Sequence, residues 1–190
     1  MNTIFSTNTD VTPKSGVVRF LTITVVGMML LTISAKMHVP FYPVPMTLQT
    51  LAVMAFASMF GMRQAGAIFI GYLAMGALGF PVFSGSPERG IGIAYMMGPT
   101  GGFLVGMFVA TLFVGRFAYG KSSLVQLAVM AISLVPVFGL GLAWLANFVP
   151  ADKVLAYGFM PFILGDIVKV GIAALCAPLA FKLLRRAGLI

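Results

Sequence analysis

The chain has 190 residues, of which 60% are hydrophobic and only 8% are charged. Its mean hydropathy is +1.06, whereas a typical globular domain is about half apolar and a quarter charged. Because so few charges cannot cover so much apolar surface in water, the composition excludes an ordinary water-soluble domain and predicts a membrane protein.

Six apolar stretches approach the roughly 20 residues that a helix needs to cross the lipid bilayer. The breaks between them are rich in proline and glycine, which interrupt regular helix. The predicted helices cover residues 17–37, 47–60, 65–78, 101–119, 124–148 and 158–184. Residues 1–16 are polar and are expected to form a cytoplasmic tail before a single transmembrane domain, residues 17–190. We therefore predict an all-α membrane protein with six transmembrane helices.

Lysine and arginine are distributed unevenly between the two sides that these six spans define. The side with both termini carries Lys14, Arg19, Arg63, Arg116, Lys121, Lys182, Arg185 and Arg186. The opposite side carries Lys36, Arg89 and Lys153. Since basic residues accumulate on the cytoplasmic side of membrane proteins, both termini are predicted to lie in the cytoplasm. The net charge of +8 is therefore interpreted as a topology signal and not as a surface for nucleic acid.

Small residues recur every four positions in the stretch 101–119, at Gly102, Gly106 and Ala110. On a helix this spacing forms a small-residue stripe that lets a second helix approach closely. We expect this helix to pack tightly within the bundle.

The sequence offers no arrangement typical of a catalytic site. Neither Gly-x-Ser-x-Gly nor His-Glu-x-x-His occurs, and residues 120–123 are interpreted as a turn and not as a phosphate-binding loop. The only histidine, His38, has no carboxylate beside it, and four acidic residues are too few for a typical carboxylate metal site. We therefore predict that the protein is not an enzyme and has no metal or cofactor.

Two opposite charges lie inside the last predicted helix, which is otherwise apolar. Asp166 and Lys169 are three residues apart, so on a helix they share one face. Each charge at mid-membrane costs on the order of 2.5–3.5 kcal/mol on insertion scales, and an ion pair lowers that cost without removing it. One interpretation is that the pair only fixes the register of the helix. The favoured one is that this face lines a polar cavity that holds a ligand.

Further polar and aromatic residues lie toward the same side of the membrane. Gln49, just inside the second helix, can bond a neighbouring helix or offer a donor and an acceptor to a ligand. The connection of residues 79–100 is either a plain connector or a lid, since loops of this length are commonly functional. Aromatic side chains come from Phe41, Tyr42, Phe83 and Tyr95. Together these features favour a small ligand with apolar bulk and a few polar atoms.

Four short motifs occur in an order and at distances that match a known family. They are VPMTLQTL at 44–51, GFPVFSG at 79–85, GPTGG at 98–102 and GDIVK at 165–169. Together they resemble the BioY family, the biotin-binding S components of energy-coupling-factor (ECF) transporters. The resemblance extends from the first predicted helix to the last.

This resemblance implies a six-helix fold with one biotin pocket on the outward side, closed by the loops after the first and third helices. It implies that Asp166 and Lys169 contact biotin and that Ser84 and Ser86 lie in a loop beside it. It also implies a transmembrane coupling protein and two ATPase subunits as partners, in a bacterial cell membrane. The alternatives are an S component for another vitamin and a membrane scaffold with a structural charge pair. The sequence leaves open whether the chain also pairs with a second copy of itself.

Overall fold

A computed structural model describes residues 13–188 of the chain. The helices are α1 (Pro13–Lys36), α2 (Gln49–Ala77), α3 (Gly92–Met96), α4 (Gly101–Phe117), α5 (Ser123–Leu145), α6 (Val154–Gly158) and α7 (Met160–Arg186). A 3-10 helix, Ala151–Lys153, precedes α6. Two short antiparallel strands, β1 (His38–Val39) and β2 (Met46–Thr47), pair between α1 and α2.

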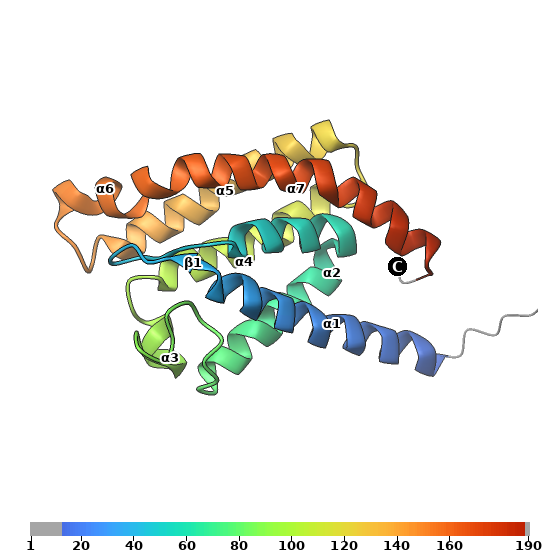
Figure 1. Ribbon diagram of the computed structural model, residues 1–190, viewed down its shortest axis with the longest axis horizontal. Helices are drawn as coiled ribbons and strands as arrows, with labels where there is room; N and C mark the ends of the chain where they lie inside the picture. Colours follow the sequence, from blue (N-terminus) through green and yellow to red (C-terminus); the bar gives the residue numbers. More distant parts are fainter. Residues whose placement is uncertain (1–12, 189–190) are drawn as a thin grey trace, which may run out of the picture.

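Within residues 13–188, four helical stretches are long and apolar enough to cross a membrane, and α4 is a shorter apolar helix. The four are Gly16–Lys36, Gln49–Ala77, Ser123–Leu145 and Ala151–Arg186. One of them, α2, contains two predicted helices, because its backbone breaks at Gly61, whose φ of +76° is a conformation that glycine adopts readily. Figure 1 shows α2 turning back on itself at this break. For the described residues, the prediction of an all-α membrane protein with six long helical segments is confirmed.

The ends of the helices differ from the predicted ones by a few residues. α1 begins at Pro13, before the predicted start at residue 17, and most of the predicted tail, residues 1–12, lies outside the described residues. The short helices α3 and α6 and the β1–β2 pair were not predicted. Elements this short hold too few residues to show a periodic pattern of hydrophobicity.

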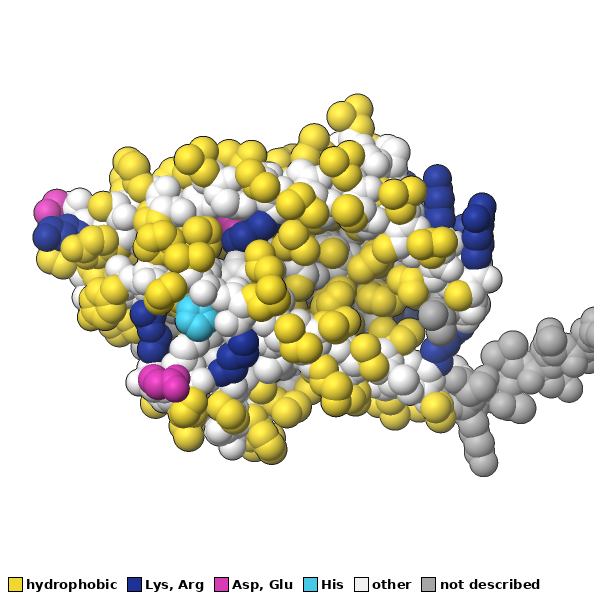
Figure 2. Space-filling model, viewed as in Figure 1, with side chains coloured by type: hydrophobic (Ala, Val, Ile, Leu, Met, Phe, Trp, Pro, Cys, Tyr) yellow, Lys and Arg dark blue, Asp and Glu magenta, His cyan; other side chains and the backbone are white. Residues whose placement is uncertain are grey.

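The first arm of α2 lies at the centre of the bundle. α2 packs against α1, α4 and α7, and α5 packs against α4 and α7. The start of α1 and the end of α7 lie together at one end of the molecule, here called the terminal end, whereas β1, α3 and α6 lie at the opposite, loop end (Figure 1). On the face shown in Figure 2, the terminal end carries Lys and Arg without Asp or Glu, while the loop end carries both signs.

Glycine brings α4 and α5 into close contact. A Cβ atom on Gly106 would lie 2.6 Å from the carbonyl oxygen of Pro136 and 2.7 Å from Cα of Val137. Both are backbone atoms of α5, so no side chain can move aside to make room. The predicted close packing of the small-residue stripe is therefore confirmed, and Ala110 is also buried.

The link between α4 and α5 has the residue spacing of a phosphate-binding loop. Gly115, Gly120, Lys121 and Ser122 match the pattern Gly-x-x-x-x-Gly-Lys-Ser. Such a loop follows a β-strand, and its exposed backbone N–H groups surround the phosphates. Here Gly115 and the two residues after it are part of helix α4, and the rest is a short turn into α5. The segment is therefore the predicted turn, and its spacing does not indicate a nucleotide site.

Candidate functional site

A cavity lies among the helices near the loop end. It contains about 560 Å³ of space that protein atoms do not fill, part of it open to the surroundings. Its wall comes from the β1–β2 segment, the start of α2, the loop after α2, α3, α4, α5 and α7. The lining residues are Val44, Pro45, Thr47, Gln49, Thr50, Ser84, Tyr95, Thr100, Phe103, Leu104, Met107, Val137, Phe138, Phe162, Asp166 and Lys169.

α7 contributes the charged part of this wall. Phe162, Asp166 and Lys169 follow one another at spacings of four and three residues, which places them on one face of the helix. Lys169 Nζ donates to Asp166 Oδ1 at 2.8 Å, and the two residues are only 7% and 4% exposed. The ion pair therefore faces the cavity and not the lipid. An ammonium group has three N–H donors, and among the described residues only Asp166 accepts one, so Lys169 can also donate to a ligand.

Two uncharged polar groups in the wall have no hydrogen-bond partner among the described residues. They are the amide nitrogen Nε2 of Gln49 and the hydroxyl oxygen of Ser84, in residues that are 3% and 5% exposed. An unpaired buried polar atom costs about 1–3 kcal/mol. A third such atom, Oε1 of Gln126, lies at the start of α5 and outside the cavity wall. The cavity thus offers two buried groups whose hydrogen bonds a ligand can complete.

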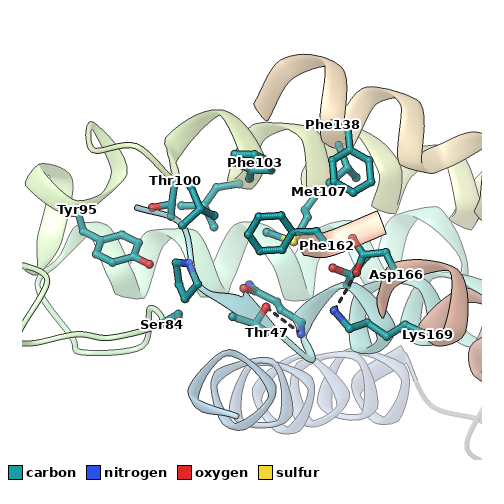
Figure 3. A pocket seen from close by; sticks show the side chains of 16 residues that line it. Thr47, Ser84, Tyr95, Thr100, Phe103, Met107, Phe138, Phe162, Asp166 and Lys169 are labelled. Atoms are coloured by element: carbon teal, nitrogen blue, oxygen red, sulfur yellow. Dashed lines mark hydrogen bonds and ion pairs between the residues drawn. The ribbon is translucent and has the colours of Figure 1, made fainter. Parts of the chain in front are cut away.

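The polar groups lie at two ends of the cavity. Figure 3 shows Tyr95 and Ser84 at one end and the Asp166–Lys169 pair at the other, with Phe162 between them. Burial raises the pKa of the Tyr95 phenol above its usual value, so the hydroxyl stays protonated at neutral pH and can donate a hydrogen bond. This arrangement suits an elongated ligand with an apolar middle and polar groups at both ends.

Hydrogen bonds tie together the segments that bound the cavity at the loop end. Arg89 in the loop after α2 donates from Nη1 to the Pro43 carbonyl at 3.1 Å and from Nη2 to the Phe41 carbonyl at 3.0 Å. Lys36 Nζ, at the end of α1, donates to the Ser86 carbonyl at 2.6 Å and to its hydroxyl at 3.0 Å. The segments 37–48 and 78–91 are therefore held to each other and to α1.

The structure places five of the predicted ligand-contacting residues in this one wall. They are Gln49, Ser84, Tyr95, Asp166 and Lys169. They come from α2, the following loop, α3 and α7, and only the folded chain brings them together.

The other four predicted residues lie outside the wall. Phe83 is buried and stacks on Tyr95 with ring centroids 4.7 Å apart, and Phe41 packs edge-on against Phe162 at 6.1 Å. Phe83 and Phe41 therefore pack against Tyr95 and Phe162, two aromatic rings that line the cavity. Ser86 donates to the carbonyl of Phe83 at 2.6 Å, and Tyr42 is 82% exposed. Direct contact of these four residues with a ligand stays a prediction.

Most of the apolar wall was not predicted. It includes Phe103 and Met107 of α4, Phe138 of α5 and Phe162 of α7. In a membrane helix an apolar residue gives the same sequence signal whether it faces lipid or a cavity. Only Phe162 has a usable signal, because it stands four residues before Asp166 and must share its helix face.

Comparison with known proteins assigns the chain to a family. The sequence model of the BioY family matches residues 5–186. The probable biotin transporter BioY of Pyrococcus horikoshii is 35% identical over 148 residues, which cover 78% of this chain and 87% of that protein. The biotin transporter BioY of Thermotoga maritima is 34% identical over 151 residues, with coverage of 78% and 87%.

The fold gives a consistent result. It matches the crystal structure of the S-component for biotin from an ECF-type ABC transporter with a TM-score of 0.76, over 90% of this chain and 95% of that one. The two sequences are 20% identical, so this likeness shows a shared fold. The family match spans all four motifs that carried the resemblance in the sequence, and the resemblance is confirmed. The chain belongs to the BioY family.

Proposed function

We propose that the chain is the substrate-binding S component of an ECF transporter and that it binds biotin in the cavity at the loop end. The relatives' names and the shared S-component fold support this assignment. The structural observation that carries it is the gathering of one ion pair and two unpartnered polar atoms in a single buried wall. A bundle that only crosses the membrane needs none of these groups there.

The chemistry of biotin matches the polar and apolar parts of the wall. Biotin has two ureido N–H donors, a ureido oxygen, a fused sulfur ring and a carboxylate on a flexible chain. Asp166 accepts a hydrogen bond from a ureido N–H, while Lys169 donates to an oxygen of the ligand. Gln49 Nε2 donates to a second acceptor, which removes its unpaired state. The ring of Phe162, between the polar ends, contacts the apolar part of the ligand.

In this proposal the segments 37–48 and 78–91 form the lid over the bound vitamin. The hydrogen bonds from Arg89 and Lys36 support this role, because they join the two segments across the loop end. The lid faces the outside of a bacterial cell membrane, and both termini lie in the cytoplasm. The excess of Lys and Arg at the terminal end supports this orientation.

The proposal includes partners that supply energy. Uptake against a concentration gradient needs an energy source, and the α4–α5 link is a turn and not a nucleotide site. We therefore assign a transmembrane coupling protein and two ATPase subunits to the complete transporter.

The direct test is biotin binding to purified protein by isothermal titration calorimetry. Asp166→Asn and Lys169→Ala should each weaken biotin affinity about tenfold or more, since hydrogen bonds to charged groups contribute about 1.5–3 kcal/mol. Lys153→Ala is the matched control, because it removes an exposed cation at the loop end and should leave the affinity unchanged. Unchanged affinity in both charge-pair variants would refute the proposal.

The same binding assay also tests two alternative functions. Titration with thiamine and riboflavin tests whether another vitamin is the ligand, and tighter binding of either would replace biotin. The scaffold alternative predicts that joint replacement, Asp166→Leu with Lys169→Met, preserves whatever function the protein has. Loss of biotin binding in this double variant of a still-folded protein would exclude a purely structural pair.

A further inference from the structure

The turn between α3 and α4, residues 97–100, separates two residues of the cavity wall. Tyr95 precedes the turn and Thr100 is its last residue, and both line the cavity. Backbone hydrogen bonds shape the turn: the N–H of Gly98 donates to the Tyr95 carbonyl at 3.0 Å, and the N–H of Gly101 donates to the Gly98 carbonyl at 3.0 Å. These bonds join residues that are close in sequence, so they set the shape of the turn but not its place in the bundle.

Trp144, near the end of α5, attaches this turn to the rest of the bundle. Its indole Nε1 donates to the Gly98 carbonyl at 2.9 Å, across 46 positions of the sequence. Within residues 13–188, Trp144 is the one residue outside the segment 92–102 whose side chain hydrogen-bonds to that segment. A carbonyl oxygen has two lone pairs, so Gly98 accepts from Gly101 and from the indole together.

Glycine allows the indole to lie directly against the start of α4. A Cβ atom on Gly101 would lie 3.1 Å from Trp144 Nε1, and one on Gly102 would lie 3.0 Å from Trp144 Cγ. The same Cβ on Gly102 would lie 2.5 Å from the Leu140 carbonyl oxygen, a backbone atom of α5. A side chain at either position would therefore separate the indole from the turn.

The helix that carries Trp144 is itself part of the cavity wall. Val137 and Phe138 of α5 line the cavity, and α5 is in backbone contact with α4 at Gly106. Trp144 lies about two turns beyond these lining residues, since an α-helix has 3.6 residues per turn. The indole hydrogen bond thus fixes the position of Tyr95 relative to a wall that cannot readily shift.

We propose that Trp144 is a positioning residue for ligand binding, which holds the Tyr95 hydroxyl in place at one end of the cavity. This role rests on the proposed function, in which a ligand fills the cavity. Trp144 is not among the lining residues, so it acts through the turn and not by touching the ligand. Asp166 and Lys169 lie at the opposite end of the cavity, so their contact with the ligand should not depend on Trp144.

A double-mutant cycle, measured by isothermal titration calorimetry on the purified full chain, separates positioning from general stability. Trp144→Phe keeps an aromatic ring and removes the N–H donor, so it should weaken biotin affinity about fivefold. Tyr95→Phe removes the hydroxyl that the indole holds in place, and in this background Trp144→Phe should weaken affinity less than about twofold. In the Asp166→Asn background Trp144→Phe should keep its full effect, because that carboxylate lies at the other end.

Phe148→Leu is the matched control. Phe148 packs beside Trp144 with ring centroids 6.2 Å apart, and its side chain has no donor for the turn, so biotin affinity should be unchanged. Hydrogen–deuterium exchange of the ligand-free protein gives a second measurement. Trp144→Phe should raise the exchange of backbone amides in residues 98–104 several-fold, whereas Phe148→Leu should not.

Three results would overturn the inference. The first is unchanged biotin affinity in Trp144→Phe. The second is an equal loss of affinity from Trp144→Phe with and without the Tyr95 hydroxyl, which would mean that the indole only stabilises the fold. The third is unchanged amide exchange in ligand-free Trp144→Phe, whichever vitamin the protein binds. If the wild type binds thiamine or riboflavin and not biotin, the proposed function is wrong, and the same cycle is measured with the vitamin that binds.

Discussion

The two hollows of this molecule share a helix but differ in almost every other respect. α7 supplies Asp166 and Lys169 to the cavity at the loop end, and Ala180 and Leu183 to an apolar groove that lies between α1, the first arm of α2 and α7. The cavity has buried polar groups without partners among the described residues, whereas the groove is lined almost entirely by apolar side chains, with Thr22 as its one hydroxyl. Buried polar atoms reject ligands that cannot pair with them, so the wall of the cavity is suited to selective binding, whereas the groove offers no comparable polar groups.

The helices around the two hollows also differ in how closely they pack. Behind the cavity, α4 and α5 are in backbone contact at Gly106, so this wall cannot readily shift. At the groove, α1 and α7 both pack on α2, and unfilled space remains between them. A selective site requires a fixed wall, and the close α4–α5 contact supplies one behind the cavity.

The largest expected effect comes from breaking the ion pair on one side only. Lys169→Met leaves the Asp166 carboxylate buried without its partner, which should cost about 3–5 kcal/mol of stability. The double replacement Asp166→Leu with Lys169→Met removes both charges and should unfold at nearly the wild-type temperature. Thermal unfolding of the purified variants measures the difference.

Arg186→Gln is the control for this comparison, because it removes an exposed charge from the same helix and should change the unfolding temperature little. Equal destabilisation by the single and double replacements would mean that the two side chains are held by contacts other than each other.

The next largest effect concerns the wall of α4 and α5. Gly106→Ala forces a methyl group against backbone atoms of α5 and should cost about 1–3 kcal/mol, with weaker biotin binding as the cavity wall shifts. Gly139→Ala is the matched control, because a Cβ there meets nothing within 4 Å and the change should stay within about 1 kcal/mol. If both variants unfold at the same temperature, the contact at Gly106 is not a tight one.

The smallest of these effects concerns the lid. Arg89→Gln removes two hydrogen bonds to the segment 37–48, and the side chain is exposed, so the expected loss is only about 1 kcal/mol. Biotin should leave roughly fivefold faster while its rate of binding changes little. Stopped-flow measurement of the single tryptophan, Trp144, whose indole donates to the Gly98 carbonyl near the lid, can follow release. An unchanged release rate would show that the lid does not depend on Arg89.

The helical framework could be predicted from the sequence because hydrophobic length is a strong signal in membrane proteins. Gly61 marked the turn within α2, and the spacing of Gly102 and Gly106 marked close packing of α4 within the bundle, without naming the partner helix. The β1–β2 pair could not be predicted, because it forms between residues on either side of a proline-rich segment that has no periodic pattern. The two strands are brought together by the fold of the loop end and not by a local sequence pattern.

The site was predictable where a residue was out of place in lipid. Asp166, Lys169 and Gln49 are polar residues in apolar stretches, and all three line the cavity. Phe103 and Met107 could not be found in this way, because they are ordinary residues of a membrane helix. The predicted absence of enzymatic activity and of a cofactor is supported by family membership, since the relatives are named as transporters.

The position of both ion-pair partners on α7 also bears on how the protein is made. Asp166 and Lys169 are one turn apart on the same helix, so their bond can form as soon as that segment coils. A segment with this bond already formed carries no net charge at this point when it enters the bilayer. Partners on two separate helices would each have entered as a lone charge, at the full cost of insertion.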